Sequence, residues 1–330
     1  MRRALITGGS GFVGRHLIRS LQSRGFQLAV LASGEFEKIS DVASYEVDIR
    51  DAERVRSAIR DFRPDHVYHL AAISSVGLSW KSPRLTYEVN VFGTLNVIEA
   101  AMSLPAPPMI LNVSTAQVYA RSWTALTESS PLGPDNPYAA SKAMAEWLSV
   151  QYRAHSDVKV ITARSFNHAG PGQSTDYVLS SIAKQFAEIE ARLREPKLVL
   201  GNIHVQRDFT DVRDVIGAYC LLLEKGIAYE TYNVCSGRAW SIGEVVEKFQ
   251  SISGVLIDVE VDFAKLRPDE NELVCGDHQK IRAATGWAPA IPLHTTLEDM
   301  LNYWRAAIRK QSTETSELEH SARSLHLQEK

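Results

Sequence analysis

Ala4-Leu-Ile-Thr-Gly-Gly-Ser-Gly-Phe-Val-Gly14 is the stretch that decides the fold. Residues 4–7 precede a glycine-rich turn and are predicted to form a short buried strand, and a helix-like pattern follows over residues 12–24. Glycine has no Cβ, so the backbone between the strand and the helix can turn sharply. A strand, a glycine turn and a helix in this order predict the first unit of a parallel α/β sheet.

The alternation of buried strands and helices continues to about residue 165. It predicts the α/β fold class with a Rossmann-type, doubly wound parallel sheet, because parallel strands are covered by helices on both faces. The further strands that we expect are 28–32, 66–72, 109–114 and 158–164, and the further helices are 51–62, 83–102 and 138–154.

The regular alternation of strands and helices ends after residue 165, and glycine and proline cluster in residues 167–173. Residues 1–165 are therefore predicted to form one domain, and a strand near 231–235 is expected to return to its sheet. Residues 166–310 are predicted to form a smaller C-terminal α/β domain. Residues 311–330 are polar with little periodicity, so we expect a mobile tail outside any site.

The composition is that of a globular protein. Of the 330 residues, 45% are hydrophobic and 23% are charged, with a formal net charge of −3. This charge predicts no general affinity for nucleic acid or for an anionic membrane, and no apolar run approaches the ~20 residues of a membrane span. Cys220, Cys235 and Cys275 lack metal-ligand spacing, so we expect reduced thiols, no metal site and a cytoplasmic location.

The glycine turn also carries a functional signal. A helix N-terminus offers N–H groups and the positive end of a dipole, and glycine lets the backbone approach a pyrophosphate closely. We therefore predict a dinucleotide-binding domain in residues 1–165. The residues expected to hold the pyrophosphate are Gly8, Gly11, Phe12, Val13 and Gly14.

The end of the second expected strand bears on the choice of dinucleotide. Residues 31–34, Leu-Ala-Ser-Gly, lack the acid that an NAD-preferring site usually places there for the adenosine ribose. Arg15 and Ser33 can meet a 2′-phosphate instead, so NADP is favoured as the cofactor and NAD is possible. Asp48 and Ile49 follow a short expected strand, and they are expected to flank the adenine.

His69-Leu-Ala-Ala72 is expected at the end of the next strand. Leu70, Ala71 and Ala72 are predicted to line the pyrophosphate and the nicotinamide ribose. Two interpretations of His69 stay open. It lines the same site, or its ring is simply satisfied by hydrogen bonds at the strand end.

Tyr138 and Lys142 are predicted to lie one turn apart on the same face of a helix. An ammonium group in that place stabilises a phenolate, so the tyrosine can exchange a proton nearer neutral pH. With the dinucleotide site, this pair predicts proton and hydride exchange at a carbinol or carbonyl carbon.

These motifs together resemble the extended short-chain dehydrogenase/reductase family over essentially residues 1–310. The resemblance implies that Tyr138 donates a proton to a sugar carbonyl and that Thr115 hydrogen-bonds the same oxygen. It implies that Lys142 binds the nicotinamide ribose, and it places Asn90 and Tyr138 in the cofactor site too. The matching segments are Thr7–Gly14, His69–Ala72, Asn90–Thr94, Ser114–Thr115 and Tyr138-x-x-x-Lys142.

The second half is similar to the reductases of GDP-4-keto-6-deoxy-D-mannose that form GDP-D-rhamnose. Its matching segments are Arg164–Gln173, Arg207–Asp214, Tyr232–Gly237 and Leu266–Glu270. The resemblance implies a nucleotide-diphosphate sugar, with a GDP-sugar favoured, bound by residues 166–310. Arginine suits a diphosphate because its planar fork can bond two oxygens. The substrate-binding residues that we expect are Ser74, Ser75, Thr115, Asn167, Asn202, Arg207, Arg267 and Glu270.

Gln117 departs from the related dehydratases, which place an acid two residues after the threonine. A neutral amide cannot donate and retrieve the proton needed to eliminate water, so reduction is favoured. The alternatives are a GDP-mannose 4,6-dehydratase, an NAD-dependent nucleotide-sugar 4-epimerase and a non-enzymatic dinucleotide-binding protein. The intact Thr115, Tyr138 and Lys142 disfavour the last. The resemblance also implies a homodimer formed through helices 83–102 and 138–154.

Overall fold

The computed structural model describes residues 1–34, 38–154, 156–262 and 271–328, which divide into two compact units. Unit 1 consists of Met1–His168, Gln206–Ala239 and Leu273–Ala290. Unit 2 consists of Ala169–Val205, Trp240–Glu272 and Ile291–Lys330.

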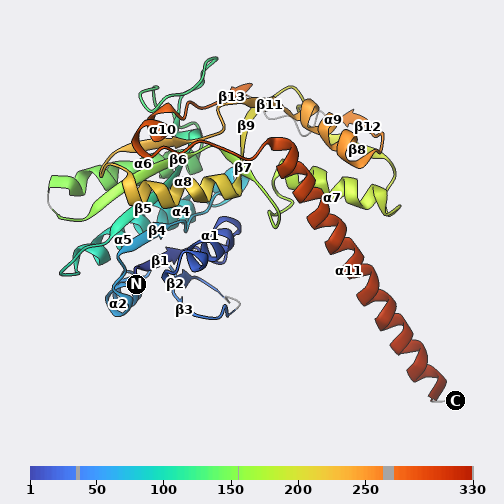
Figure 1. Cartoon of the computed structure of the whole chain (residues 1–330), viewed down its shortest axis with the longest axis horizontal. Helices are drawn as coiled ribbons and strands as arrows, with labels where there is room; N and C mark the ends of the chain where they lie inside the picture. Colours follow the sequence, from blue (N-terminus) through green and yellow to red (C-terminus); the bar gives the residue numbers. More distant parts are fainter. Residues whose placement is uncertain (35–37, 155, 263–270, 329–330) are drawn as a thin grey trace. The chain divides into compact units, whose positions relative to one another are not determined.

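A seven-stranded parallel sheet forms the centre of unit 1 (Figure 1). The strand order is β10-β6-β5-β4-β1-β2-β3, which confirms the predicted α/β class and doubly wound sheet. The strands are β1 (Arg3–Thr7), β2 (Gln27–Ala32), β3 (Val42–Glu46), β4 (His66–His69), β5 (Met109–Thr115), β6 (Lys159–Ser165) and β10 (Thr231–Val234). The edge strand β3 is the short strand expected before Asp48, and its residues are exposed or half-buried.

Alternate residues of the strands point to opposite faces of this sheet. Ala4 and Ile6 pack into one core with helices α1 and α8, whereas Leu5 packs into a second core with α2 and α5. Both faces are therefore covered, as a parallel sheet requires. The helices are α1 (Phe12–Ser23), α8 (Val212–Lys225) and α10 (Gln279–Thr285) on the first face, and α2 (Ala52–Phe62), α5 (Gly93–Met102) and α6 (Pro137–Gln151) on the second.

The remaining elements of unit 1 are short. They are α3 (Val76–Lys81), α4 (Pro83–Tyr87), a π-helix (Glu88–Phe92), 3-10 turns at Ala116–Val118 and Tyr152–Ala154, and β9 (Gln206–Asp211) paired with β13 (Leu273–Val274). β7 (Asn167–Ala169) and β11 (Ala239–Ser241) also pair with β9, where the chain passes between the units.

Unit 2 has its own small core. Its elements are α7 (Val178–Glu190), β8 (Lys197–Leu200), α9 (Ile242–Ser253), β12 (Asp258–Val261) and α11 (Leu293–Gln328). β8 and β12 pair in parallel, and α7, α9 and α11 pack together, with Phe186 stacked on Phe249 at 5.4 Å. An Arg305–Glu190 ion pair at 2.6 Å joins α11 to α7.

Three differences from the expected elements have physical reasons. The predicted strand 66–72 ends at His69, because the backbone groups of Ala71 and Ile73 bond side chains instead of a neighbouring strand. The predicted helix 83–102 contains a π-helical turn. The predicted tail 311–330 continues α11 as a helix to Gln328; its mobility remains a prediction.

More of the chain returns to unit 1 than the single strand expected near 231–235. That strand is β10 at the sheet edge, but Gln206–Ala239 and Leu273–Ala290 both belong to unit 1. The reason is α8, whose Val212, Val215 and Ile216 are buried against the sheet core.

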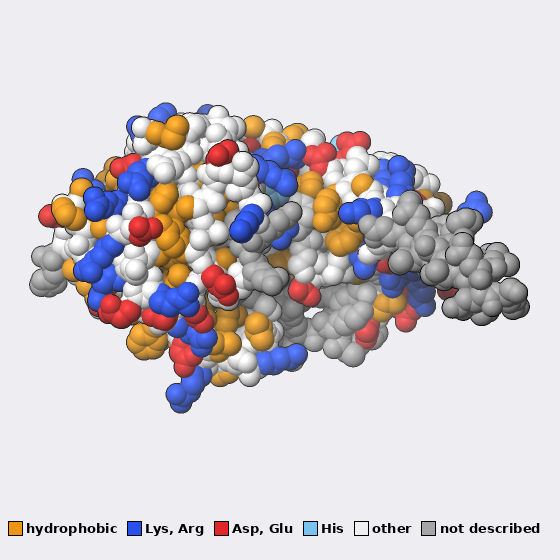
Figure 2. Space-filling model, turned by 90° about the horizontal axis from the view of Figure 1, so that it is seen from below, with side chains coloured by type: hydrophobic (Ala, Val, Ile, Leu, Met, Phe, Trp, Pro, Cys, Tyr) orange, Lys and Arg blue, Asp and Glu red, His pale blue; other side chains and the backbone are white. Residues whose placement is uncertain are grey.

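One face of the molecule carries mixed charges. On the face in Figure 2, Lys and Arg side chains lie interspersed with Asp, Glu and hydrophobic side chains, in agreement with the net charge of −3. Among the described residues, no helix combines the length and apolarity needed to cross a bilayer.

Candidate active site

The glycine turn between β1 and α1 is packed so closely against neighbouring backbone that a side chain would not fit. Gly8 has φ +70°, and a Cβ there would lie 2.8 Å from the backbone N of Ala71. A Cβ on Gly14 would lie 2.6 Å from Cα of Gly9. Gly11 caps α1 without a side-chain hydrogen bond, so no cap side chain covers the N–H groups of the first turn. This arrangement fits the pyrophosphate of a dinucleotide.

The residues expected at the adenosine end follow β1 and β2. Arg15 is exposed and its Nε donates to the carbonyl of Ser10 at 3.1 Å, while Ser33 is exposed directly after β2. Asp48 Oδ2 accepts from Arg50 Nη2 at 2.6 Å, and this contact lowers the pKa of Asp48. Arg15 and Ser33 are therefore accessible to a ligand, whereas Asp48 already has a partner.

The segment after β4 lies beside the glycine turn. Leu70 N donates to the Thr7 carbonyl at 3.2 Å, and Ala71 N donates to Thr7 Oγ1 at 3.1 Å. The other apolar residues of the predicted cofactor site are half-buried or buried; they are Phe12, Val13, Ile49 and Ala72.

Thr115, Tyr138 and Lys142 are all buried where β5 ends and α6 begins. Tyr138 lies in the first turn of α6, whose N-cap Asn136 accepts from the backbone N of Ala139 at 2.9 Å. Lys142 Nζ donates to the carbonyl of Val113 at 2.8 Å, two residues before Thr115 on β5. The structure therefore brings the predicted catalytic lysine to the strand end that carries Thr115.

Burial lowers the pKa of Lys142 to about 8, and the negative charge of Glu146 opposes this shift. Glu146 follows Lys142 by one turn of α6 and binds Arg164 through two guanidinium nitrogens, at 2.7 Å from Nη2 and 3.0 Å from Nε. Ser114 Oγ also donates to Glu146, and the Arg164 guanidinium stacks 4.7 Å over the ring of Tyr119. A buried ion pair therefore joins β5, α6 and β6 behind the lysine.

The sequence prediction missed the role of Glu146 and Arg164, although a signal was present. An arginine inside a buried strand requires a partner, because an unpaired charge is costly to bury. Glu146 is one helical turn after Lys142, on the same face of the predicted helix. Asn90, which was predicted at the cofactor, is fully buried in the π-helix and bonds Ile73 and Ser141.

The predicted substrate residues are scattered more widely. Ser74 and Ser75 are exposed after β4, where Ser75 Oγ accepts from Leu78 N at 3.2 Å as the cap of α3. Asn167 is exposed at the start of β7, and Arg207 Nη1 donates to its neighbour's carbonyl on β9 at 2.9 Å. Asn202 belongs to unit 2, and Arg267 and Glu270 lie outside the described residues.

Asp208, next to Arg207, is a second residue that sequence reasoning left without a role. Its buried carboxylate accepts from the backbone N of Ser236 at 2.8 Å, of Gly237 at 2.9 Å and of Gly276 at 3.1 Å. Burial raises its pKa while these donors lower it. Asp208 thus ties β9, which carries Arg207, to two loops of unit 1.

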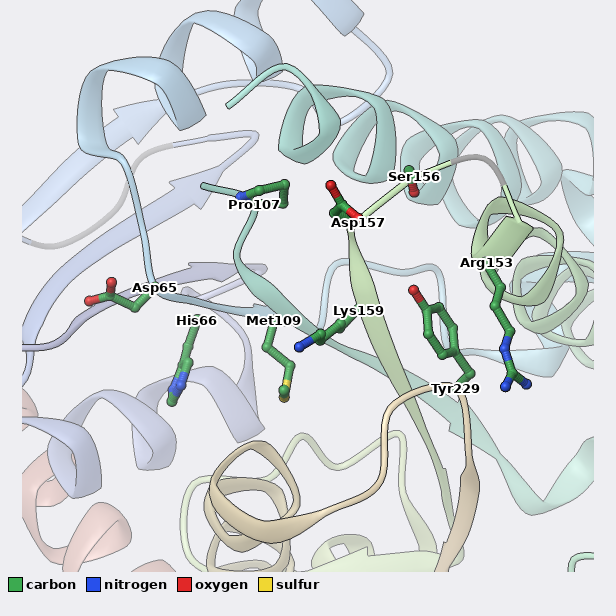
Figure 3. A pocket seen from close by; sticks show the side chains of 9 residues that line it. All are labelled: Asp65, His66, Pro107, Met109, Arg153, Ser156, Asp157, Lys159 and Tyr229. Atoms are coloured by element: carbon green, nitrogen blue, oxygen red, sulfur yellow. The ribbon is translucent and has the colours of Figure 1, made fainter. Parts of the chain in front are cut away.

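A pocket in unit 1 lies away from these residues. It measures about 670 Å³ and opens where β4, β5 and β6 begin, at the opposite edge of the sheet (Figure 3). Its lining includes Asp65, His66, Met109, Lys159 and Tyr229, and none of the predicted site residues.

Known proteins are similar to this chain in sequence and in architecture. Residues 5–300 match the family model described as GDP-mannose 4,6 dehydratase. The GDP-6-deoxy-D-mannose reductase of Pseudomonas aeruginosa is 34% identical over 94% of this chain and 99% of its own.

Two solved structures are similar throughout. A putative epimerase from Burkholderia cenocepacia is 36% identical, with a TM-score of 0.85 over 92% of this chain and 98% of its own. The structure of RMD from Pseudomonas aeruginosa, complexed with NADPH, is 33% identical, with a TM-score of 0.83 over 93% of this chain and 100% of its own. The chain therefore belongs to the GDP-mannose 4,6 dehydratase family, within the extended short-chain dehydrogenases/reductases, and is an NAD(P)-dependent enzyme that modifies nucleotide sugars.

Proposed function

We propose that this enzyme reduces the 4-keto group of GDP-4-keto-6-deoxy-D-mannose and forms GDP-D-rhamnose, with NADPH as the reductant. Similarity over nearly the whole chain to a GDP-6-deoxy-D-mannose reductase supports the sugar and the base. The NADPH complex of the Pseudomonas RMD supports NADP, as does the lack of an acid in residues 31–34.

The glycine turn and the segment 70–72 would hold the dinucleotide, whose nicotinamide supplies hydride when bound. Tyr138 would give its phenolic proton to the sugar oxygen, and the Lys142 ammonium would stabilise the phenolate that remains. Thr115 Oγ1 accepts from Gln117 N at 3.2 Å, so its own hydrogen is left to donate to the same sugar oxygen. Burial of Thr115, Tyr138 and Lys142 strengthens these interactions by excluding water.

The observation that carries the choice of reduction over dehydration is Gln117. It follows Thr115 by two residues, and its Oε1 accepts from Asn136 Nδ2 at 3.3 Å. An amide does not ionise, so this position supplies no acid or base for the loss of water. Reduction of a ketone requires one proton donor, and Tyr138 meets that need.

A direct assay tests the proposal. Purified protein, NADPH and GDP-4-keto-6-deoxy-D-mannose are mixed, the absorbance of the reduced nicotinamide is followed, and the sugar product is identified by NMR. We expect oxidation of NADPH together with GDP-D-rhamnose. Absence of NADPH oxidation would refute the reduction, and GDP-6-deoxytalose would correct the face to which hydride is delivered.

An epimerase is the second candidate, because a putative epimerase is 36% identical over 92% of this chain. An epimerase keeps its dinucleotide and returns the hydride to the opposite face of the sugar. Purification with tightly bound NAD, and interconversion of 4-epimeric nucleotide sugars without added NADPH, would favour it. Turnover of GDP-mannose by the enzyme alone would favour a 4,6-dehydratase.

We also propose a homodimer, as the resemblance implies. The expected helices 83–102 and 138–154 carry the exposed side chains of Phe92 and Trp147, which are 56% and 63% exposed and would lie on the dimer surface. A second copy would cover this surface. Sedimentation equilibrium should show a dimer that Trp147→Glu dissociates, and a monomeric wild-type protein would contradict it. Further exposed hydrophobic side chains of α3 and α6 are Leu78, Trp80, Met144 and Val150.

A further inference from the structure

A chain of buried polar side chains crosses unit 1 behind the candidate active site. It begins at the end of β1, passes through the end of β4 and the helices that follow, and ends at the first turn of α6. Its members are 2% exposed or less, and every one is hydrogen-bonded; they are Thr7, His69, Thr94, Asn90 and Ser141.

The hydrogen bonds of Thr94 determine the tautomer of His69. Thr94 Oγ1 lies 2.7 Å from the carbonyl of Asn90 and 2.9 Å from His69 Nε2. A carbonyl only accepts, so the single hydroxyl hydrogen of Thr94 is given to Asn90. His69 Nε2 must therefore carry the hydrogen of the second contact.

The other ring nitrogen then acts as an acceptor. His69 Nδ1 lies 2.8 Å from Thr7 Oγ1, and Thr7 Oγ1 in turn accepts from the backbone N of Ala71 at 3.1 Å. Thr7 therefore donates its own hydrogen to Nδ1. With this single assignment, both hydroxyls and both ring nitrogens are satisfied.

A second proton on the ring would disrupt the chain. It would turn Nδ1 into a donor and leave the hydroxyl hydrogen of Thr7 without its acceptor. Burial of the ring, together with the smaller effect of the positive charge of Lys142 on α6, lowers the pKa of His69 to about 3. The imidazole is therefore neutral near neutral pH.

The chain connects two parts of the proposed active site. At one end, Thr7 holds Ala71, whose backbone N lies only 2.8 Å from the position that a Cβ on Gly8 would take. At the other end, Asn90 Nδ2 donates to Ser141 Oγ at 2.9 Å, and Ser141 Oγ donates to the carbonyl of Tyr138 at 2.7 Å. The pyrophosphate turn and the turn of the proton donor thus share one hydrogen-bonded path.

We propose that His69 is a positioning residue, held as the Nε2–H tautomer, which couples the glycine turn to the helix turn of Tyr138. This role rests on the function proposed above, because it concerns how the dinucleotide and Tyr138 are held. The tautomer itself follows from the hydrogen bonds alone and can be tested without any ligand.

The first test is long-range ¹H–¹⁵N NMR of the ligand-free wild-type protein with ¹⁵N-labelled histidine. The resonances of His69 are assigned by their loss in His69→Gln. If that variant does not fold, they are assigned in the wild-type protein by their correlations with the signals of neighbouring residues. We expect one tautomer with the hydrogen on Nε2 and no titration between about pH 5 and pH 9. A hydrogen on Nδ1, or a titration within this range, would overturn the assignment.

The second test compares Thr94→Val with Thr94→Ser. Valine removes the hydroxyl and leaves the buried Nε2–H of His69 without its acceptor, whereas serine keeps the hydroxyl. We expect the Kd for NADPH, measured by fluorescence at a temperature where both variants are folded, to rise about tenfold in Thr94→Val and less than about twofold in Thr94→Ser. Thermal unfolding of the same samples separates this effect from stability.

His66→Gln is the matched control, because His66 begins the same strand but lies outside the chain, at the opposite edge of the sheet. We expect its Kd for NADPH to equal that of the wild type. A Thr94→Val variant with lowered Tm but unchanged NADPH affinity would reduce the chain to a structural role and overturn the proposal. Failure of the keto-sugar reduction alone would leave the tautomer and the affinity ratio intact, so the two proposals fail separately.

Discussion

The two edges of the parallel sheet in unit 1 differ in how their polar groups are held. At the edge where the strands end, Thr7, His69 and Lys142 are buried and each is hydrogen-bonded. At the edge where they begin, Asp65 and Lys159 are exposed around the pocket of about 670 Å³ (Figure 3). Buried polar side chains with fixed hydrogen bonds, and not the presence of a pocket, therefore mark the end of the strands that we propose as the active site.

Tyr138→Phe should have the largest effect on activity among the substitutions that compare the two edges of the sheet. Removal of the proton donor should lower kcat by about 10²- to 10⁴-fold, the usual contribution of a positioned general acid. NADPH affinity should change little, because the ring remains. Initial rates of NADPH oxidation with the keto sugar, and a separate NADPH titration, measure the two quantities.

Tyr229→Phe is the matched control at the other edge, where the Tyr229 hydroxyl donates to the carbonyl of Val158 at 2.8 Å. It removes the same phenolic oxygen from a tyrosine that lines the pocket. We expect kcat to stay within about twofold of the wild type, as for most substitutions outside a site. Equal losses in the two variants would abolish the distinction between the edges.

The next effect concerns stability. Glu146→Gln leaves the buried Arg164 guanidinium without its counter-charge, which should lower the free energy of unfolding by about 3–5 kcal/mol. Glu230→Gln removes a half-exposed ion pair with Lys280, in which the N–O distance is 2.7 Å. This substitution should change the free energy of unfolding by less than about 1 kcal/mol. Urea unfolding of both variants tests this; similar losses would show that burial does not decide the value of these pairs.

The sequence predicted the parts of the fold that depend on local pattern. The glycine turn, the strands from β1 to β6, and the spacing of Tyr138 and Lys142 are properties of short segments. The Glu146–Arg164 pair and the His69 chain are not, because their members meet only after distant elements pack. For the same reason the return of α8 to unit 1 was missed, since its apolar faces indicate burial but not the surface that buries them.

A third prediction uses the pKa of Lys142, which burial lowers from 10.5 to about 8. Between these values the unfolded chain binds more protons at this lysine than the folded protein, so its contribution to stability rises with pH. The activity should move the other way, because the ammonium that stabilises the Tyr138 phenolate is lost above about pH 8. Unfolding free energies of wild type and Lys142→Met, compared from pH 7 to pH 10, isolate the first effect, and the pH profile of kcat measures the second. If the unfolding free energy of the wild type falls relative to that of Lys142→Met as the pH rises, the pKa of Lys142 is not lowered in the folded protein.

The smallest effect is expected where the charges are most exposed. Arg153 and Lys159 line the pocket at the edge where the strands begin, and Arg153 stacks 5.1 Å over the ring of Tyr229. The double variant Arg153→Ala and Lys159→Ala removes two solvated charges, so kcat/KM should stay within about twofold of the wild type. Steady-state kinetics with the keto sugar, at low and at physiological salt, measure this ratio. A larger change in kcat/KM, above all one that depends on salt, would mean that charges at this edge affect the reaction. The two edges would then differ in their distance from the reacting atoms, but both would contribute to turnover.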